Sequence, residues 1–518
     1  MKITHSAQTV SACAMPQQIL PPLIEALRQA GRYPDPAIEV ELIETHASWL
    51  LLAGDFAYKI KKPITLPFLD YGTLEKRRAC CAAELRLNRR FAPDLYLDVV
   101  ALLGTPDNPR FADLAEANPS SQVLEFAVKM RRFTEAGRLD HLCVRGELRP
   151  AQVSALAVAI VRFHDAAAMA RPETRFGTPA VILGEVLENF TELRALLSDA
   201  ASQKRLDALQ EWTTNESQRL HPDFVARKAA GRVRECHGDL HLGNLVLIEG
   251  RVTLFDCIEF NEDFRWIDVA SEVAFTYVDL LDHAQPGLAG WLINEWLSHS
   301  GDHAALPVLR FYAVYRALVR AKVAAIRLAQ GSGDVGEVRG YLALAENLVA
   351  PPPSRLVITH GLSGCGKTHA STQLILDDTS GSLLRLRADV ERKRLFGLSA
   401  TARSGSPLGG GIYGQEANQR TYQRLYDVAR LALAAGWSVL VDAAFLKRTE
   451  RDTFRALAAE MRADCFILAP QATPEQLRQR IEARLAKGSD ASEATLAVLE
   501  KQRDWIEALD ADARKLLL

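Results

Sequence analysis

The chain has 518 residues, too many for one ordinary hydrophobic core, and this length predicts two domains. Apolar residues make up 48% and charged residues 24% of the sequence, which excludes the apolar excess of a membrane protein and the polarity of a disordered one. The formal net charge of -2 gives no global attraction to nucleic acid or anionic lipid, so any contact with a polyanion must be local.

The eight cysteines are scattered, without the CxxC spacing of a zinc or redox site, and we expect reduced thiols. The N-terminal segment Met1 to Pro16 lacks the apolar stretch of a secretory signal. The longest apolar run, near Leu431 to Val441, is shorter than the roughly 20 residues needed to cross a bilayer. These features predict a cytoplasmic protein.

The proline run from Pro351 to Pro353 marks the clearest domain boundary, because successive prolines cannot continue a helix and favour an extended connector. Downstream, apolar strands alternate with helices, which predicts a parallel sheet flanked by helices. The expected strands are Leu356 to Thr359, Leu383 to Leu386, Ser438 to Val441 and Cys465 to Leu468. We therefore divide the chain into residues 1–350 and 351–518.

The first half begins with strands and continues with helices, the order of an α+β domain. Its β-rich stretches are Ile38 to Glu44, Trp49 to Ala53 and Phe56 to Ile60, and a helix is expected around Leu74 to Arg90. Helices dominate after Pro150, and Leu306 to Leu328 and Val338 to Val349 have helical spacing. The two halves share no pattern, so we expect a fusion of unrelated modules.

The segment Gly361-Leu-Ser363-Gly364-Cys365-Gly366-Lys367-Thr368 fits the P-loop pattern G-x-x-x-x-G-K-[ST], or Walker A motif. In this pattern the backbone N–H groups of the whole segment wrap the phosphates of a nucleoside triphosphate, Lys367 reaches the terminal phosphates, and Thr368 ligates Mg²⁺. The strand expected before it and a helix expected over Lys367 to Leu376 supply the required context. The segment therefore predicts a binding site for ATP and Mg²⁺.

Two carboxylates follow later strands of the same half. Asp389 comes after the second strand and is a candidate base for the proton of an acceptor hydroxyl. Alternatively, it is the N-cap of a helix whose basic run, Arg392 to Arg394, forms a solvated face. Asp442 ends the strand that begins at Ser438, the position of a carboxylate that orients Mg²⁺.

Three arginines, Arg478, Arg480 and Arg484, lie on one predicted helix, and the last two are four residues apart, on one face. Such a face can be a mobile lid whose arginines stabilise charge on the transferred phosphoryl group, or it can be an ordinary exposed basic face. We predict that Arg480 and Arg484 are catalytic.

These motifs make the second half similar to the P-loop kinases of small molecules and polynucleotides, including gluconate-kinase-like and zeta-toxin-like proteins. The similarity extends over Arg387-Ala-Asp389, the Asp442 strand and the stretch from Arg480 to Ala494, which resembles their lid. It implies a P-loop NTPase-type fold with ATP and Mg²⁺ as cofactors. It leaves the acceptor open, because these kinases act on sugars, nucleotide sugars and nucleic acid ends.

The first half contains His237-Gly-Asp239-Leu-His241-Leu-Gly-Asn244, which keeps the order and spacing of the protein-kinase catalytic loop. In that loop the Asp accepts the hydroxyl proton and the Asn holds Mg²⁺. The strands Leu245 to Ile248 and Val252 to Phe255 form a predicted hairpin, and Asp256 follows it where a second Mg²⁺ carboxylate is expected.

This arrangement resembles the aminoglycoside and choline phosphotransferases of the kinase-like fold, which also have HGD. The resemblance implies a bilobal domain, with an N-lobe of about residues 1–130 and a helical C-lobe of about 131–350. It implies that Asp239 is the catalytic base, that Asn244 and Asp256 are Mg²⁺ ligands, and that small molecules are the acceptors. His237 and His241 shape the loop.

By the same resemblance, Lys59 takes the position of the ATP-binding lysine and Glu84 that of its ion-pair partner. Lys61 competes with Lys59, because residues two apart on a strand point the same way. The loop Thr45 to Ser48, where such kinases cover the nucleotide, contains no glycine. Glu125 to Met130 is expected to be the hinge that binds adenine.

The favoured function is an ATP-dependent enzyme with two kinase sites that act on small hydroxylated molecules. The five acidic residues Glu259, Glu262, Asp263, Asp268 and Glu272 would suit a polycationic aminoglycoside, but we favour a capping or solvated role for them. The alternatives are a regulatory or toxin-like protein with one inactive site, and a P-loop half that phosphorylates nucleic acid ends. Nucleic acid is the less favoured partner, no membrane partner is expected, and the oligomeric state stays open.

Overall fold

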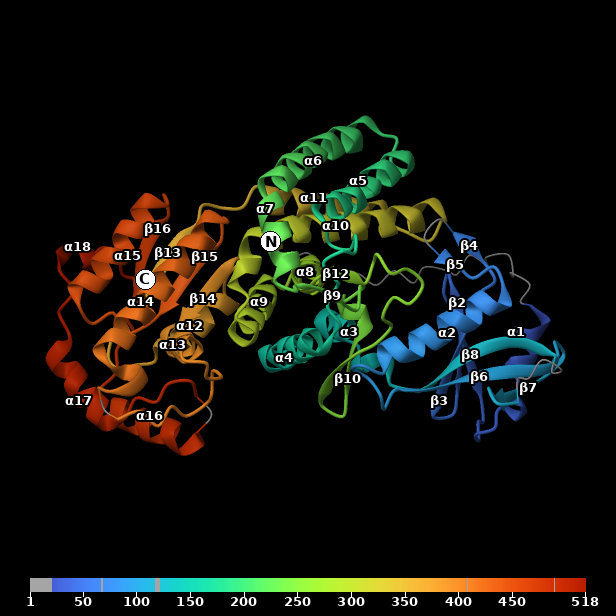
Figure 1. Ribbon diagram of the computed structural model, residues 1–518, viewed down its shortest axis with the longest axis horizontal. Coiled ribbons are helices and arrows are strands. Elements are labelled where there is room, and N and C mark those ends of the chain that lie inside the picture. The colour runs from blue at the N-terminus through green and yellow to red at the C-terminus, as the bar shows by residue number, and fades with distance from the viewer. Residues whose placement is uncertain (1–20, 67–68, 117–121, 408, 489) are drawn as a thin grey trace, which may run out of the picture. The chain divides into compact units, whose positions relative to one another are not determined.

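The computed structural model describes residues 21–518 except 67–68, 117–121, 408 and 489, so the expectation for Met1 to Pro16 lies outside it. Its contacts divide the chain into two compact units, Met1–Phe133 and Thr134–Leu518 (Figure 1). The second unit contains both the helical part of the first half and the P-loop half. The domain boundary at Pro351 stays a prediction.

The first unit is built on an antiparallel sheet of six strands in the order β1-β2-β3-β8-β6-β7. Its strands are β1 (Val40–Glu44), β2 (Ser48–Ala53), β3 (Phe56–Lys61), β6 (Tyr96–Thr105), β7 (Asn108–Asp113) and β8 (Val123–Arg131), with the short pair β4 (Thr65–Leu66) and β5 (Leu69–Asp70). Its helices are α1 (Pro22–Leu27) and α2 (Leu74–Asn88). Apolar side chains of α1 and the sheet, such as Leu27, Leu51 and Ile60, form its core.

The predicted adenine hinge is wrong as placed. Glu125 to Met130 lie inside β8, which pairs with β3 on one side and β6 on the other. Most of the backbone groups of this stretch are therefore held in the two ladders and are not free to bind adenine. The stretch that was expected to follow the end of a strand belongs to the strand itself.

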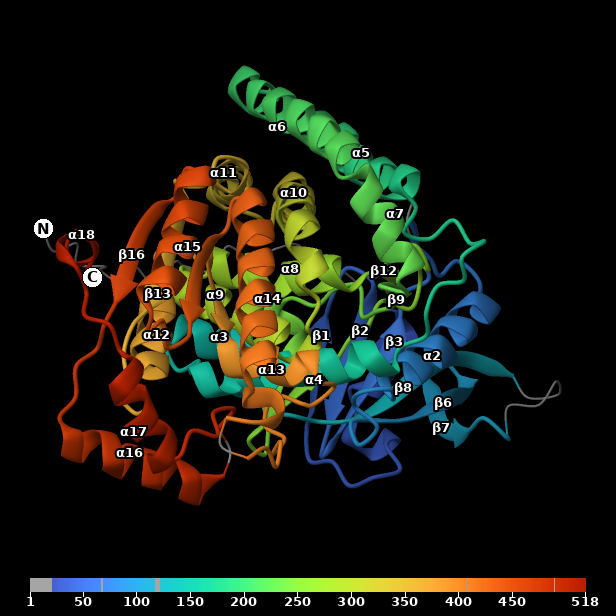
Figure 2. The same cartoon turned by 60° about the vertical axis from the view of Figure 1, so that its left-hand side comes forward.

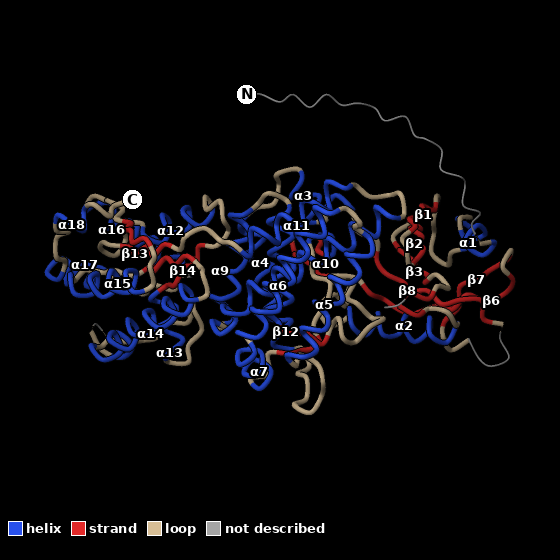
Figure 3. Tube along the Cα trace, turned by 90° about the horizontal axis from the view of Figure 1, so that it is seen from above, coloured by secondary structure: helices blue, strands red, loops and turns tan. Residues whose placement is uncertain are grey.

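The helical part of the second unit contains nine α-helices and two small pairs of strands (Figure 3). The helices are α3 (Leu139–Val144), α4 (Pro150–Ala166), α5 (Pro179–Leu196), α6 (Ala200–Arg219), α7 (His221–Ala229), α8 (Val269–Asp282), α9 (Pro286–Ser300), α10 (Leu306–Ala329) and α11 (Val335–Val349). The paired strands are β9 (Val233–Glu235) with β12 (Trp266–Asp268) and β10 (Leu245–Ile248) with β11 (Arg251–Leu254).

The rest of the second unit is a parallel sheet in the order β14-β15-β13-β16, on which α12, α14 and α15 pack (Figure 2). The strands are β13 (Arg355–Thr359), β14 (Leu383–Arg387), β15 (Ser438–Asp442) and β16 (Asp464–Leu468). The helices are α12 (Lys367–Leu376), α13 (Ala388–Leu395), α14 (Gln415–Ala434), α15 (Arg448–Glu460), α16 (Pro474–Lys487), α17 (Leu496–Trp505) and α18 (Ala511–Arg514). The predicted fold class is confirmed, with an α+β part followed by a parallel sheet flanked by helices.

Helix α9 of the helical part closes the edge of this sheet. The buried Asn294 side chain donates to Leu383 O at 2.8 Å and accepts from the Arg385 N–H at 2.5 Å, so it pairs the outer edge of β14 as a strand would. Gly287 allows the helix to approach, because a Cβ there would lie 1.9 Å from Leu376 O. The helical part and the P-loop half are therefore packed together through buried contacts. The expectation of a simple fusion did not include these contacts.

Replacing Asn294 with Ala should destabilise the second unit by about 2–4 kcal/mol, because it leaves two backbone groups of a buried edge without partners. Urea unfolding followed by circular dichroism measures the shift in midpoint. Asn215→Ala, at an exposed position of α6, is the matched control and should change the free energy of unfolding by less than about 0.5 kcal/mol. Equal effects of the two substitutions would contradict the edge-capping role.

His303 lies buried at the same junction. Its Nδ1 accepts from Arg424 at 3.2 Å and its Nε2 lies 3.7 Å from Glu391 Oε1. Burial lowers the pKa of His303 to about 4, against the attraction of Glu391 and with the help of the charges of Arg394 and Arg424. The imidazole is therefore neutral in the folded protein at neutral pH.

Stability should fall as the pH drops from about 6.5, the ordinary His value, to about 4. Between these pH values the unfolded chain binds a proton at His303 that the folded chain does not. The contribution of neutral His303 to the free energy of unfolding is therefore complete above about pH 6.5 and is lost as the pH falls to about 4. The loss amounts to roughly 3 kcal/mol. Urea midpoints from pH 7.5 to 4.5 should decline less steeply for His303→Gln than for the wild type, and parallel curves would refute the assignment.

Candidate active sites

The predicted catalytic loop, His237 to Asn244, is held from one side by helix α8. Glu272 Oε1 accepts two backbone N–H groups of the loop, from His237 at 2.6 Å and from Gly238 at 2.8 Å. Thr276 donates to Leu240 O at 2.6 Å, and Asp279 Oδ2 accepts the Leu242 N–H at 2.7 Å. The three side chains share one face of the helix, so they fix the backbone of the loop as one block.

Asp239 and Asn244 meet within this loop as predicted. Asn244 Nδ2 donates to the Asp239 carbonyl oxygen at 2.9 Å and to its carboxylate at 3.0 Å. His241 Nε2 lies 3.5 Å from the same carboxylate. Burial acts to raise the pKa of Asp239, but His241 and His237 hold it well below its usual value. The carboxylate is thus ionised at neutral pH and still 37% exposed, as a proton acceptor must be.

Asp256 follows the predicted hairpin, whose strands β10 and β11 are joined at Glu249 and Gly250. Both turn residues have positive φ (49° and 78°), the conformation of a tight two-residue turn. Asp256 itself has φ of 64°, and the Phe255 N–H donates to Asn244 O at 3.0 Å. This bond ties the Asp256 end of the hairpin to the end of the loop, so carboxylate and amide oxygens suited to Mg²⁺ lie on adjoining segments.

His237 has the structural role expected for it. It is fully buried, and its Nε2 is hydrogen-bonded to Phe255 O at 2.8 Å. Burial lowers the pKa of His237 below its usual value, so the ring is neutral and joins the loop to the hairpin.

All five acidic residues after the hairpin are bound or buried within the protein itself. Asp268 caps α8 and forms an ion pair with Arg227, Glu272 holds the catalytic loop, and Glu262 pairs with Arg265. Asp263 pairs with Arg175, and the fifth residue, Glu259, is buried. The capping role expected for Asp268 is confirmed. A solvated role is wrong for Glu272, which is 1% exposed, because its partners are backbone groups more than 30 positions away.

In the first unit, Lys59 and Lys61 both bind Glu84. Lys59 Nζ lies 2.9 Å from Glu84 Oε1 and Lys61 Nζ lies 2.7 Å from Oε2. Burial opposes ionisation of Glu84, but the two ammonium groups lower its pKa well below the usual value. The side chain of Lys59 is 18% exposed and that of Lys61 only 1%, so Lys59 is the lysine within reach of a ligand. Its role in binding ATP stays a prediction.

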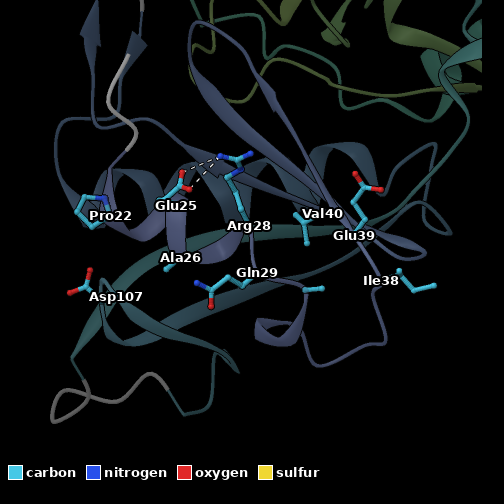
Figure 4. A pocket seen from close by; sticks show the side chains of 10 residues that line it. Pro22, Glu25, Ala26, Arg28, Gln29, Ile38, Glu39, Val40 and Asp107 are labelled. Carbon is cyan, nitrogen blue, oxygen red and sulfur yellow. Dashed lines mark hydrogen bonds and ion pairs between the residues drawn. The ribbon is translucent and has the colours of Figure 1, made fainter. Parts of the chain in front are cut away.

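A surface hollow of the first unit lies near α1, lined by residues that include Glu25, Arg28, Ile38 and Asp107 (Figure 4). Arg28 and Glu25 form an ion pair at 3.2 Å at this hollow. None of the predicted site residues belongs to its lining. Its location therefore adds nothing to the candidate sites.

The P-loop runs from the end of β13 into α12, as predicted. Gly361, Gly364 and Gly366 have φ of 138°, 86° and 104°, a conformation that side chains rarely adopt. A Cβ on Gly364 would lie 2.8 Å from Leu477 O. Lys367 Nζ donates to the carbonyl oxygens of Gly361 at 2.8 Å and of Leu362 at 2.9 Å. The loop forms a backbone cradle that fits phosphate groups, with the ammonium group folded over it.

Thr368 and Asp442, the two predicted Mg²⁺ ligands of this half, are in contact. The Thr368 hydroxyl donates to Asp442 Oδ2 at 2.9 Å. Arg387 Nε lies 3.9 Å from the same carboxylate oxygen, and its Nη2 lies 3.4 Å from Asp490 Oδ1. A hydroxyl and a carboxylate beside a phosphate cradle are the donors that Mg²⁺ requires in P-loop proteins.

Helices α16 and α17 pack against the P-loop through a small apolar cluster that includes Cys365, Leu477 and Leu499. The Ser363 N–H donates to Gln502 Oε1 at 2.8 Å, so one amide of the cradle is capped by α17. Nothing in the sequence around Gln502 indicated this role, because its partner lies more than 130 residues away. Cys365 contributes its backbone to the cradle, while its side chain is buried.

The two predicted lid arginines of α16 reach different partners. Arg480 Nη1 donates to the carbonyl oxygens of Gly364 and Cys365, both at 3.3 Å, so it lies over the P-loop. Arg484 Nη2 donates to Ala494 O at 2.8 Å, within the lid stretch. The catalytic roles of both stay predictions.

Asp389 lies in the first turn of α13, and the N-cap is Arg387, so the N-cap alternative for Asp389 is wrong. The solvated basic face is wrong as well. Arg392 is 6% exposed and donates to Ile412 O and Asn418, while Lys393 is fully buried and pairs with Glu493 at 3.2 Å. These cations hold the segment after α13, which the spacing of charges could not reveal.

No helix in the described part of the chain is both long and apolar enough to span a membrane.

Residues 141–312 match the model of the phosphotransferase enzyme family (APH), and residues 356–509 match that of an AAA domain (AAA_33). An uncharacterized protein of Mycobacterium tuberculosis (strain H37Rv) is 29% identical over 473 residues, which cover 91% of each chain.

Among solved structures, a choline/ethanolamine kinase family protein from Mesorhizobium loti is 14% identical and covers 62% of this chain and 90% of its own, with a TM-score of 0.38. A sugar kinase from Janibacter sp. HTCC2649 is 24% identical and covers 31% of this chain and 82% of its own, with a TM-score of 0.24. The family matches coincide with the two motifs. The chain therefore joins an aminoglycoside-phosphotransferase-like domain, similar over residues 141–312 to the phosphotransferase enzyme family, to a C-terminal P-loop domain.

Proposed function

We propose that the protein is an ATP-dependent phosphotransferase with two kinase sites, each transferring the γ-phosphate of ATP to a hydroxyl group of a small molecule. The observation that carries the proposal is that each half assembles its own set of donors. Asn244 contacts the Asp239 carboxylate in one half, and Thr368 contacts the Asp442 carboxylate in the other. The two sets belong to unrelated folds, so each supports a separate reaction.

In the first site, Asp239 accepts the proton of the acceptor hydroxyl, and Asn244 and Asp256 hold Mg²⁺. The bonds from α8 keep the Asp239 backbone in place, so the carboxylate need not reorganise during the reaction. In the first unit, Lys59, paired with Glu84, is the lysine that we propose binds phosphate.

In the P-loop site, the backbone amides of Gly361 to Thr368 and the Lys367 ammonium bind the phosphates, and Thr368 and Asp442 hold Mg²⁺. Asp389 is the base, and Arg480 and Arg484 balance charge from the lid. When bound, ATP supplies the phosphoryl group, and Mg²⁺ supplies part of the positive charge that neutralises it.

The test uses the purified full-length chain with γ-labelled ATP, Mg²⁺ and a panel of sugars, amino alcohols, aminoglycosides and oligonucleotides. Transfer of label to a small hydroxylated molecule, dependent on Mg²⁺, is expected. Labelling of oligonucleotide ends alone would favour a polynucleotide kinase instead. If the protein binds no ATP and labels no acceptor, the proposal fails.

A further inference from the structure

Arg385, on strand β14, donates hydrogen bonds to the beginning of the P-loop helix α12. Its Nη1 lies 2.7 Å from Thr372 Oγ1 and 3.3 Å from Ser371 Oγ. Both hydroxyls in turn donate to the carbonyl oxygen of Thr368, from Thr372 at 2.9 Å and from Ser371 at 3.0 Å. Arg385 Nη1 itself lies 3.5 Å from the same oxygen. One guanidinium therefore gathers two hydroxyls around the backbone of a predicted Mg²⁺ ligand.

This network fixes the residue whose hydroxyl contacts Asp442. The Thr368 side chain donates to Asp442 Oδ2 at 2.9 Å, so its direction depends on the backbone that the network holds. Ser and Thr hydroxyls in a helix can also turn towards solvent, and the guanidinium keeps both in the position that bonds to the carbonyl. Groups behind a metal ligand typically change metal affinity or activity by about 10- to 100-fold when they are removed.

Helix α9 of the helical part holds Arg385 in place. The guanidinium lies 5.2 Å from the centre of the Trp291 ring, and the Arg385 backbone N–H donates to Asn294 Oδ1 at 2.5 Å. Trp291 is 8% exposed, and its Nε1 donates to Ser154 Oγ at 2.9 Å and to Pro150 O at 3.2 Å, both on α4. The backbone and the side chain of Arg385 are thus both held by α9, and α4 holds the ring.

Arg385 is kept in position without a carboxylate partner. Among the described residues, none forms an ion pair with it. Burial lowers the pKa of Arg385 to about 10, together with the charge of Arg387 and against the attraction of Asp442 and of Glu295 on α9. The group is still a cation at neutral pH. Its position therefore depends on the aromatic ring and on the hydroxyls that it contacts.

A second arginine between the helical part and the P-loop half offers a comparison. Arg310, on α10, lies 5.4 Å from the centre of the Trp437 ring. It donates to Leu348 O at 3.2 Å and to Gly436 O at 2.8 Å. It resembles Arg385 in its packing, but these bonds end at α11 and before β15, away from the P-loop segment.

We propose that Arg385 is a positioning residue of the P-loop site and that α9 holds it there, so that the phosphotransferase-like domain helps to orient the Mg²⁺ ligand Thr368. This inference rests on the proposed function of the P-loop site. It makes that site dependent on the helical part for its function, beyond the stability that α9 gives to the edge of the sheet.

The test uses the full-length chain with Asp239→Asn, which silences the first site. Binding of a fluorescent ATP analogue is measured across Mg²⁺ concentrations, together with label transfer at the P-loop site. Arg385→Met should raise the Mg²⁺ concentration for half-maximal binding by on the order of 10- to 100-fold. Binding without Mg²⁺ should change by less than about threefold, because the backbone cradle is held by its own glycines and by α16 and α17.

Three further variants separate positioning from stability. Arg385→Lys should restore part of the Mg²⁺ dependence, because an ammonium group can still donate to a hydroxyl. Trp291→Leu should shift the dependence in the same direction as Arg385→Met, by roughly 3- to 10-fold. Arg310→Met is the matched control: it should lower the urea midpoint, as Arg385→Met does, and leave the Mg²⁺ dependence unchanged.

The inference is overturned if Arg385→Met stays within about threefold of the wild-type Mg²⁺ dependence, or if Arg310→Met shifts it equally. Binding of the analogue by the wild type without any effect of Mg²⁺ would also overturn it. If no label is transferred while Arg385→Met still weakens Mg²⁺-dependent binding, the proposed kinase function fails and the positioning role stands. If the wild type binds no analogue, both fail. If Arg385→Met does not fold, Arg385→Gln and Trp291→Leu decide by the same binding curves.

Discussion

Asp239→Asn should lower kcat for phosphoryl transfer at the first site by roughly 10²- to 10⁴-fold, the contribution of a general base. The variant should fold normally, because the Asn side chain can still accept the bond from Asn244 and the loop is held through its backbone by α8. The loss should appear in kcat, since the carboxylate acts on the proton of the acceptor. Initial rates of label transfer, measured at saturating ATP, report it.

The control for this substitution is Asp165→Asn, at an exposed position of α4, which should keep full activity. Asp239→Asn should also leave transfer at the P-loop site unchanged. A first-site rate within threefold of the wild type would mean that Asp239 is not the base. Loss of both activities together would mean that the two sites do not work separately.

Lys367→Ala should abolish transfer at the P-loop site, with a loss of at least about 10²-fold, because it removes the cation that reaches the terminal phosphates. The glycine cradle should survive, since the bonds that Lys367 makes to Gly361 and Leu362 come from its side chain and other contacts hold the loop. Binding of ATP and rates of transfer, both measured in the Asp239→Asn background, isolate this site.

Lys487→Ala, at an exposed position at the end of α16, is the matched control and should behave as the wild type. Transfer at the first site should be unaffected by Lys367→Ala. If the P-loop site keeps its rate without Lys367, the segment binds something other than the phosphates of the nucleotide that reacts.

The motifs were predictable because each is contiguous in sequence. The P-loop, Gly361 to Thr368, needs only its own glycines and the strand and helix beside it, and the structure places all three as predicted. The loop from His237 to Asn244 is equally local. Its internal bond between Asn244 and Asp239 spans five residues, so the spacing of the motif already implied it.

The supports of these motifs were not predictable, because they come from distant segments. From the sequence, Glu272 was expected to bind a cationic acceptor or to face solvent. No residue near it in the sequence indicated that it accepts hydrogen bonds from backbone groups 34 and 35 residues away. Asn294 gave no signal for the edge of a sheet 89 residues later. The basic run at Arg392 suggested a solvated face, since charge spacing does not show which face of a helix becomes covered.

By itself, the sequence determined the two motifs and the order of the elements, because the backbone conformation of each motif follows from neighbouring residues and their periodicity. Only the tertiary structure decided which charged residues remain available. Four of the acidic residues after the catalytic hairpin are paired within the protein. The physical reason is that burial and pairing depend on contacts between segments far apart in the chain, and these set the cost of every charge.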